Sequence, residues 1–280
     1  MRLASYRVEG RPEYGIVTKG GLVDLSARLP DIADLQGLLG HGLDEAREFA
    51  TAAPDRSLQE VAWLPVIPKP GQILCVGLNY KAHAAEVGRP VGDKPTIFLR
   101  VAQSQCGHGE PIVRPNASTE LDFEGELAVV IGKAGRHVPA ERALDHVAGY
   151  SLYNDASLRD WQRHSGQYTP GKNFPSTGAF GPWLVTADEI PDPSALHIRT
   201  LVNGEIVQSA PLTDLIFTIP DVLAYLSTFT ELRPGDVVIT GTPAGVGSMR
   251  KPPLWLTPGD VVEVEVPSIG MLRNPIVQES

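Results

Sequence analysis

The sequence predicts an α+β protein whose larger part is mostly β. From Ile73 onward it contains short β-branched runs, frequent Gly and Pro between them, and few long amphipathic helical patterns. The first sixty or so residues differ, because two short strand patterns there are followed by helical periodicity. We therefore expect a small amino-terminal α+β domain at residues 1–65, a proline-rich linker at 66–72 and a larger domain at 73–280.

Within the amino-terminal part, strands are expected near residues 3–8 and 15–17, and helices over residues 32–39 and 43–53. The linker prediction comes from three prolines within six positions, 65–70. Proline lacks the backbone N–H of a helix and pushes the residue before it towards extended geometry. This stretch should therefore be extended and not helical.

Composition narrows the class of ligand. The chain has 280 residues, a formal net charge of −9 and no clustered basic run, which argues against nucleic acid or an anionic membrane surface as partner. No apolar stretch is long enough to span a bilayer, and the first residues lack the apolar core of a signal peptide. Cys75 and Cys106 have no CxxC spacing and read as buried thiols in a reducing compartment. We expect a cytoplasmic protein that binds small molecules.

Residues 121–131 place two carboxylates in what otherwise looks like a buried strand. Side chains alternate along a strand, so Glu124 and Glu126 share one face with Ala128 and Val130, while the other face is apolar. Two buried like charges repel each other unless a proton or a cation neutralises them. A hard divalent ion such as Mg²⁺ would do so. The alternative is an exposed strand end.

A third carboxylate, Asp155, follows the strand-like run 147–153. Ser157 and Asp160 fit a helix capping box, which places Asp155 just outside a helix at the carboxyl end of a strand. If Asp155 joins the glutamate pair, three carboxylates hold one ion and leave positions open for water and substrate. Otherwise it forms an Asx turn.

His83 and Glu86 lie on one face of a short predicted helix, with Asn79 as its cap and Gly88 as its stop. At this spacing Glu86 can orient the imidazole and raise its basicity, which suits a general base for water. An ordinary surface pair is the alternative.

Two glycine-containing loops offer further groups. Lys172 lies in an irregular loop, 169–175, and is either a functional cation or simply exposed. Residues 239–247 follow a strand and offer backbone N–H groups and hydroxyls to an anion such as a carboxylate, or else form a glycine-rich hairpin connection.

Taken in order, these segments resemble the fumarylacetoacetate hydrolase family from about Pro68 to about Pro275. The signatures are Gly77-Leu78-Asn79-Tyr80 with His83 and Glu86, Asp122-Phe123-Glu124-Gly125-Glu126-Leu127, Asn154-Asp155 with Arg159-Asp160 and Gln162, Gly171-Lys172, and Gly241-Thr242-Pro243-Ala244-Gly245-Val246-Gly247.

The resemblance implies a mixed β-roll or barrel with a small amino-terminal domain, usually in a homodimer. It also implies one Mg²⁺ or Mn²⁺ per subunit, held by Glu124, Glu126 and Asp155. Larger members add an Asp ligand from upstream of the His segment, and this sequence shows no clear equivalent. A site of three carboxylates is therefore expected.

The resemblance further assigns roles around that ion. His83 and Glu86 would form the water-activating pair, on a segment that orders over the substrate, and Lys172 would polarise a substrate carbonyl. The expected substrate contacts are Arg159, Gln162, Thr242, Gly241, Tyr80 and Arg100.

The reaction expected from this resemblance is hydrolytic carbon–carbon cleavage of a 2,4-dioxo acid, an acylpyruvate such as fumarylpyruvate. His83 would deprotonate water for attack on the 4-carbonyl, and pyruvate would leave as an enolate stabilised by the ion. Three alternatives stay open: a decarboxylase of a 2-oxo diacid of the oxaloacetate type, an isomerase of a 2-hydroxy-diene-dioate, and, more remotely, a non-catalytic ligand-binding protein.

Overall fold

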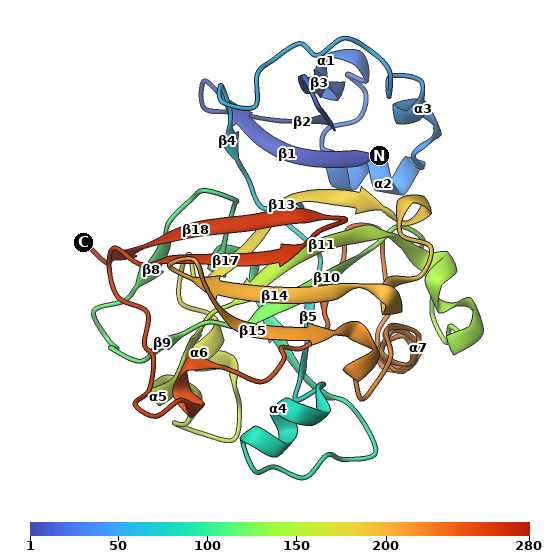
Figure 1. Ribbon diagram of the computed structural model, residues 1–280. Coiled ribbons are helices and arrows are strands. Elements are labelled where there is room, and N and C mark those ends of the chain that lie inside the picture. Colours follow the sequence, from blue (N-terminus) through green and yellow to red (C-terminus); the bar gives the residue numbers. More distant parts are fainter.

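Two β-sheets packed face to face form the body of the computed structural model, which describes residues 1–280 (Figure 1). The larger sheet has eleven strands. Its main order is β3 (Gly21–Asp24), β2 (Arg11–Thr18), β1 (Arg2–Val8), β13 (Gly178–Thr186), β11 (Val147–Asp155), β10 (Gly125–Ile131), β16 (Val237–Ile239), β5 (Ile73–Gly77) and β6 (Thr96–Arg100), with β4 (Ala62–Trp63) beside β1 and β7 (Gln105–Cys106) beside β13.

The second sheet has five strands, and a two-stranded ribbon lies near the ends of β10 and β11. The five run in the order β15 (Glu205–Pro211), β14 (His197–Val202), β17 (Val261–Val266), β18 (Gly270–Gln278) and β8 (Ile112–Arg114), and the ribbon pairs β12 (Ser157–Leu158) with β9 (Leu121–Asp122). Strand structure thus dominates, and the predicted α+β, mostly β class is confirmed.

The helices are short, as the lack of long amphipathic patterns predicted. They are α1 (Leu25–Arg28), α2 (Leu35–His41), α3 (Asp44–Arg47), α4 (Lys81–Glu86), α5 (Arg159–Gln162), α6 (Thr169–Lys172) and α7 (Ile219–Phe229). Only α7 exceeds two turns, and Thr218 and Asp221 form a capping box at its start. None of the helices combines the length and apolarity needed to cross a membrane.

Strand β10 separates the two main parts of the core. Leu127, Val129 and Ile131 join an apolar cluster shared with the five-stranded sheet, whereas Ala128 and Val130 face a second cluster that includes Leu38 of α2. Every residue of β10 is buried, because β11 and β16 flank it and both of its faces are covered. This explains the apolar character of the run after Glu126.

The amino-terminal elements continue the larger sheet, since β1 pairs with β13. The stretch at 66–72 contains neither helix nor strand, in agreement with its prolines, but Val66 and Ile67 are completely buried in the apolar cluster on the α2 side. The segment is therefore anchored. The division into domains at 65 and 73 stays a prediction.

Local capping differs from the sequence prediction at two places. The hydroxyl of Ser157 donates to the carbonyl of Asp155, and Asp160 accepts instead from Ser118, so the predicted capping box is wrong. Asn79 does not cap α4 either, because its amide bonds to backbone groups of Phe217 and Thr240. In both cases a partner distant in sequence outcompetes the local one.

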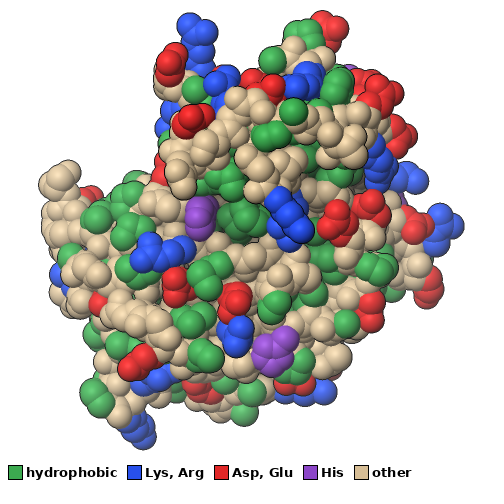
Figure 2. Space-filling view, turned by 45° about the horizontal axis from the view of Figure 1, so that its top comes forward, with side chains coloured by type: hydrophobic (Ala, Val, Ile, Leu, Met, Phe, Trp, Pro, Cys, Tyr) green, Lys and Arg blue, Asp and Glu red, His purple; other side chains and the backbone are tan.

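The surface carries both signs of charge. On the face shown in Figure 2, acidic and basic side chains are interspersed and no extended area of a single sign is visible.

Candidate metal centre and active site

Three carboxylates meet where β10 begins and β11 ends. Glu124 directly precedes β10, Glu126 lies within it, and Asp155 is the last residue of the neighbouring strand β11. One carboxylate oxygen from each residue lies within 4.8 Å of the corresponding oxygens of the other two, and all three side chains are buried. Antiparallel pairing of β10 with β11 therefore brings Asp155 beside two glutamates that precede it by 31 and 29 positions in the sequence.

Lys172, at the end of α6, adds a positive charge to this cluster. Its Nζ lies 2.5 Å from Glu124 Oε2 and 2.6 Å from Asp155 Oδ2, and the residue is only 1% exposed. Burial alone would lower the pKa of Lys172, but Asp155 and Glu124 outweigh it and raise the pKa. The lysine is thus a buried ammonium ion, not the exposed side chain of the alternative reading.

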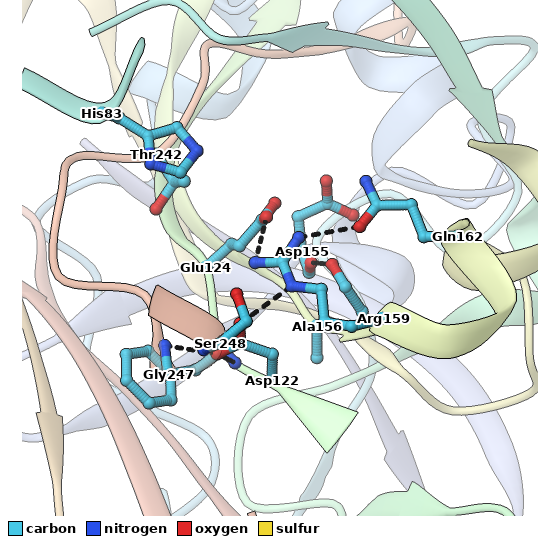
Figure 3. A network of polar contacts seen from close by, with 12 residues as sticks. His83, Asp122, Glu124, Asp155, Ala156, Arg159, Gln162, Thr242, Gly247 and Ser248 are labelled. Carbon is cyan, nitrogen blue, oxygen red and sulfur yellow. Dashed lines mark hydrogen bonds and ion pairs between the residues drawn. The ribbon is translucent and has the colours of Figure 1, made fainter. Parts of the chain in front are cut away.

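Arg159, the first residue of α5, pairs with the carboxylate oxygen of Glu124 that Lys172 does not contact. Its guanidinium contacts Asp122 Oδ2 at 2.8 Å, Glu124 Oε1 at 2.7 Å and Gln162 Oε1 at 2.8 Å (Figure 3). Burial works to raise the pKa of Glu124, yet Lys172 and Arg159 lower it to about 2. Glu124 is therefore ionised throughout the physiological range.

Asp122 connects Arg159 with the backbone at residues 247–248, a role that the sequence did not predict. Besides Arg159, its carboxylate accepts backbone N–H bonds from Gly247 at 2.7 Å and Ser248 at 3.0 Å (Figure 3). It thus ties α5 to the turn after the glycine-rich loop. A signal was present, because Asp122 lies two residues before Glu124 and continues the same period-two pattern.

Arg100 lies behind the cluster. Its Nη1 is 2.5 Å from Asp155 Oδ1, its Nη2 donates to Thr177, and its Nε donates to Ser104. Arg100 is buried and absent from the lining of the adjoining cavity. The expectation of a substrate contact is therefore corrected: Arg100 positions Asp155.

Glu126 differs from its neighbours because no Lys, Arg or His lies within ion-pair distance of it. Its Oε2 accepts the backbone N–H of Gly241 at 2.5 Å. Burial, together with Asp155 and Glu124, raises the pKa of Glu126 well above its ordinary value. The ionised form of Glu126 is thus disfavoured, because no cation of the protein stabilises it.

The donor set fits a divalent cation. Four carboxylates, those of Asp122, Glu124, Glu126 and Asp155, face only the three cations Lys172, Arg159 and Arg100. The three clustered carboxylates offer hard oxygen ligands of the kind that Mg²⁺ and Mn²⁺ prefer. Such an ion would supply the missing positive charge beside Glu126.

His83 and Glu86 form the predicted pair on α4. The imidazole Nδ1 lies 3.0 Å from Glu86 Oε2, and Glu86 Oε1 accepts the backbone N–H of Gly245 at 2.9 Å. Glu86 is thereby fixed to the glycine-rich loop and fixes the ring of His83 in turn. His83 is buried, yet it lines the same cavity as the carboxylates.

That cavity has a volume of about 420 Å³ and is lined by five of the predicted site residues besides the two glutamates. These are His83, Arg159, Gln162, Lys172 and Thr242. Thr242 donates to the carbonyl of Gly125 and accepts from Gln208, which fixes its hydroxyl at the cavity wall.

Two other expected substrate contacts are placed elsewhere. Tyr80 packs in the apolar core with 1% exposure and does not line the cavity, so the expectation that it reaches substrate is corrected. Gly241 contributes its N–H to Glu126 and adopts φ +104°. A Cβ there would lie 2.7 Å from that of Asn79, so only glycine fits. Gly241 thus supports a proposed ligand instead of lining the cavity.

Comparison with known proteins identifies the family. Residues 72–277 match the family described as fumarylacetoacetate (FAA) hydrolase, C-terminal. The chain is 40% identical over 288 residues, 99% of its length and 92% of the relative's, to oxaloacetate tautomerase FAHD2A, mitochondrial, of Homo sapiens.

Solved structures agree. Maleylpyruvate hydrolase from Sphingobium sp. SYK-6, in complex with manganese(II) and pyruvate, is 30% identical to this chain with a TM-score of 0.83. The 5-carboxymethyl-2-hydroxymuconate delta-isomerase from Mycobacterium smegmatis is 32% identical with a TM-score of 0.80. Each match covers 100% of this chain and 100% of the other chain. These relatives include a tautomerase, a hydrolase and an isomerase. The family is enzymatic, and the chain belongs to the fumarylacetoacetate hydrolase family.

Proposed function

We propose that this protein catalyses keto–enol tautomerisation of a 2-oxo diacid of the oxaloacetate type. The observation that carries the proposal is that His83, oriented by Glu86, lines the same cavity as Lys172 and Arg159. Moving a proton between oxygen and carbon needs a proton-transfer group and positive charge beside the enolate. Support for the substrate comes from the name of the human relative, which matches this chain almost from end to end.

In the proposed reaction, the O–H bond of the enol breaks and a C–H bond forms at the adjacent carbon, so the mass of the substrate is unchanged. His83 delivers the proton to carbon and regains one from the enol or from solvent. Glu86 keeps the imidazole in place, while Arg159 and Thr242 bind and orient the substrate's carboxylate. Lys172 and Arg159, which pair with Glu124, each place a positive charge at the cavity where negative charge develops on the enolate.

We further propose that Glu124, Glu126 and Asp155 hold one Mg²⁺ or Mn²⁺ per subunit, which when bound supplies Lewis-acid stabilisation of enolate charge. Manganese in the maleylpyruvate hydrolase structure supports a divalent ion in this fold. A homodimer and a cytoplasmic location stay predictions; the human relative is named as mitochondrial.

Hydrolysis of an acylpyruvate is the second candidate. The maleylpyruvate hydrolase relative favours it, and the same His83 could take a proton from water instead of from the substrate. Decarboxylation of a 2-oxo diacid, or isomerisation as named for the Mycobacterium relative, would use the same enolate chemistry.

Product analysis separates these reactions. Freshly dissolved enol-oxaloacetate should lose its ultraviolet absorbance faster with enzyme than without, at unchanged product mass and without extra CO₂. An acylpyruvate panel in H₂¹⁸O serves as the parallel assay. Label in a carboxylate product, with no acceleration of tautomerisation, would replace the tautomerase proposal with hydrolysis.

A further inference from the structure

Arg89 is the one arginine or lysine lining the cavity that has no carboxylate partner in the protein. The others are Arg159, Lys172 and Arg163. The first two pair with Glu124, and Arg163 pairs with Glu120 at 2.5 Å. Arg89 takes part in no ion pair, so its charge is available to a ligand.

The Arg89 side chain is nevertheless held in place. Its Nη1 donates to the hydroxyl of Tyr168 at 2.7 Å, and its guanidinium carbon lies 6.0 Å from the centre of that ring. Tyr168 in turn packs edge to face against Phe98, with 5.5 Å between ring centres. One N–H of the guanidinium is therefore used for positioning, and the remaining donors stay free to bind an anion.

The same aromatic pair links Arg89 to the inner charges. Lys172 Nζ lies 5.1 Å from the centre of the Phe98 ring, and Phe98 and Tyr168 both line the cavity. Positive groups thus lie at both ends of an apolar wall. A ligand that fits this arrangement carries one anionic group near Lys172 and a second near Arg89.

We propose that Arg89, held by Tyr168, binds the distal carboxylate of the substrate and makes the enzyme selective for dicarboxylic over monocarboxylic oxo acids. Arginine suits this role because its planar guanidinium can donate two parallel hydrogen bonds to a carboxylate. The proposal rests on the proposed function for the reaction, but its binding step can be tested without turnover.

The kinetic test compares Arg89→Gln with wild type on enol-oxaloacetate and on the monocarboxylic enol of phenylpyruvate. We expect kcat/KM for the diacid to fall about 10- to 100-fold, mainly through KM, because a charged hydrogen bond is lost. The monoacid should change less than threefold. Arg163→Gln is the matched control, since that arginine also lines the cavity but is already paired, and it should leave the preference intact.

A binding test uses malate and lactate as unreactive diacid and monoacid probes in isothermal titration calorimetry. Arg89→Gln should weaken malate binding about tenfold and leave lactate binding unchanged. This pattern in a protein without tautomerase activity would retain the Arg89 proposal while the proposed function fails. Equal losses for both probes, or no loss of malate binding, would overturn it.

Discussion

The pattern Glu-x-Glu occurs twice in the chain, at the start of β10 and within β17, in opposite environments. Glu124 and Glu126, at the start of β10, are buried in the carboxylate cluster. Glu263 and Glu265, in β17, point away from the core and pair with Arg273 at 3.2 Å and Arg199 at 2.7 Å.

The difference comes from what covers each strand. In β17 buried and partly exposed residues alternate, because one face packs on the larger sheet and the other meets solvent. In β10 every residue is buried, and the preceding Glu124 is buried as well. A glutamate pair therefore indicates a metal site only when its own face is covered, and the apolar run after Glu126 is the part of the sequence that shows this.

Replacing Glu126 tests this contrast with the largest expected effect. In wild type, Mg²⁺ or Mn²⁺ at a hundredfold excess over Kd should raise Tm by about 5 °C. Glu126→Gln should abolish both this shift and turnover, whereas Glu265→Gln should preserve them. Thermal unfolding with and without the ion, and with chelator, gives the measurement.

The metal-free Glu126→Gln protein should unfold at or above the wild-type temperature, because glutamine cannot ionise, whereas burial, Asp155 and Glu124 all oppose ionisation of Glu126. This control separates loss of the site from loss of the fold. A Tm shift that persists in the variant would mean that the ion binds elsewhere.

Replacement of His83 should have the next largest effect, on turnover. His83→Asn should reduce kcat by about 10²- to 10⁴-fold, because the proton-transfer group is lost. The ion-induced Tm shift should stay, since His83 is not among the clustered carboxylates. Turnover within threefold of wild type would exclude His83 as the base.

Replacement of Asp122 tests how much its contacts with Arg159 and residues 247–248 stabilise the region around Glu124. Asp122→Asn removes the charge that faces Arg159 and disturbs two backbone hydrogen bonds from the 247–248 turn. We expect the free energy of unfolding to fall by about 2–3 kcal/mol, measured in urea. A loss below 0.5 kcal/mol, as expected for the exposed Glu120–Arg163 pair, would show that Asp122 does not organise this region.

The smallest change in stability is expected when the Glu265–Arg199 ion pair of β17 is broken. Arg199→Gln breaks a partly exposed ion pair and should change the free energy of unfolding by less than about 1 kcal/mol. Added salt should reduce the difference from wild type further, since it screens exposed charges. Destabilisation as large as that of Asp122→Asn would contradict the contrast between the two strands.

Local patterns predicted much of the site, because strand alternation and helical spacing place residues within one element. Glu124 with Glu126, and His83 with Glu86, are pairs of this kind. Asp155 could be placed at a strand end, but its position beside Glu124 depends on the β10–β11 pairing, which the family resemblance supplied.

The errors arose where long-range packing decides. Arg100 ends the edge strand β6, and only the folded chain places it behind Asp155. Tyr80 has a place in the family signature, yet its ring fills the core. The sequence did not indicate Arg89, because the role proposed for it depends on its place at the cavity wall without a carboxylate partner, which only the folded chain shows.

The most direct test of the central claim is a crystal structure with Mn²⁺ and its anomalous difference map. We predict one strong peak per chain, coordinated by Glu124, Glu126 and Asp155, and none beside Glu263 or Glu265. A map without a peak among the three carboxylates at saturating Mn²⁺, with Lys172 still bridging Glu124 and Asp155, would contradict the claim.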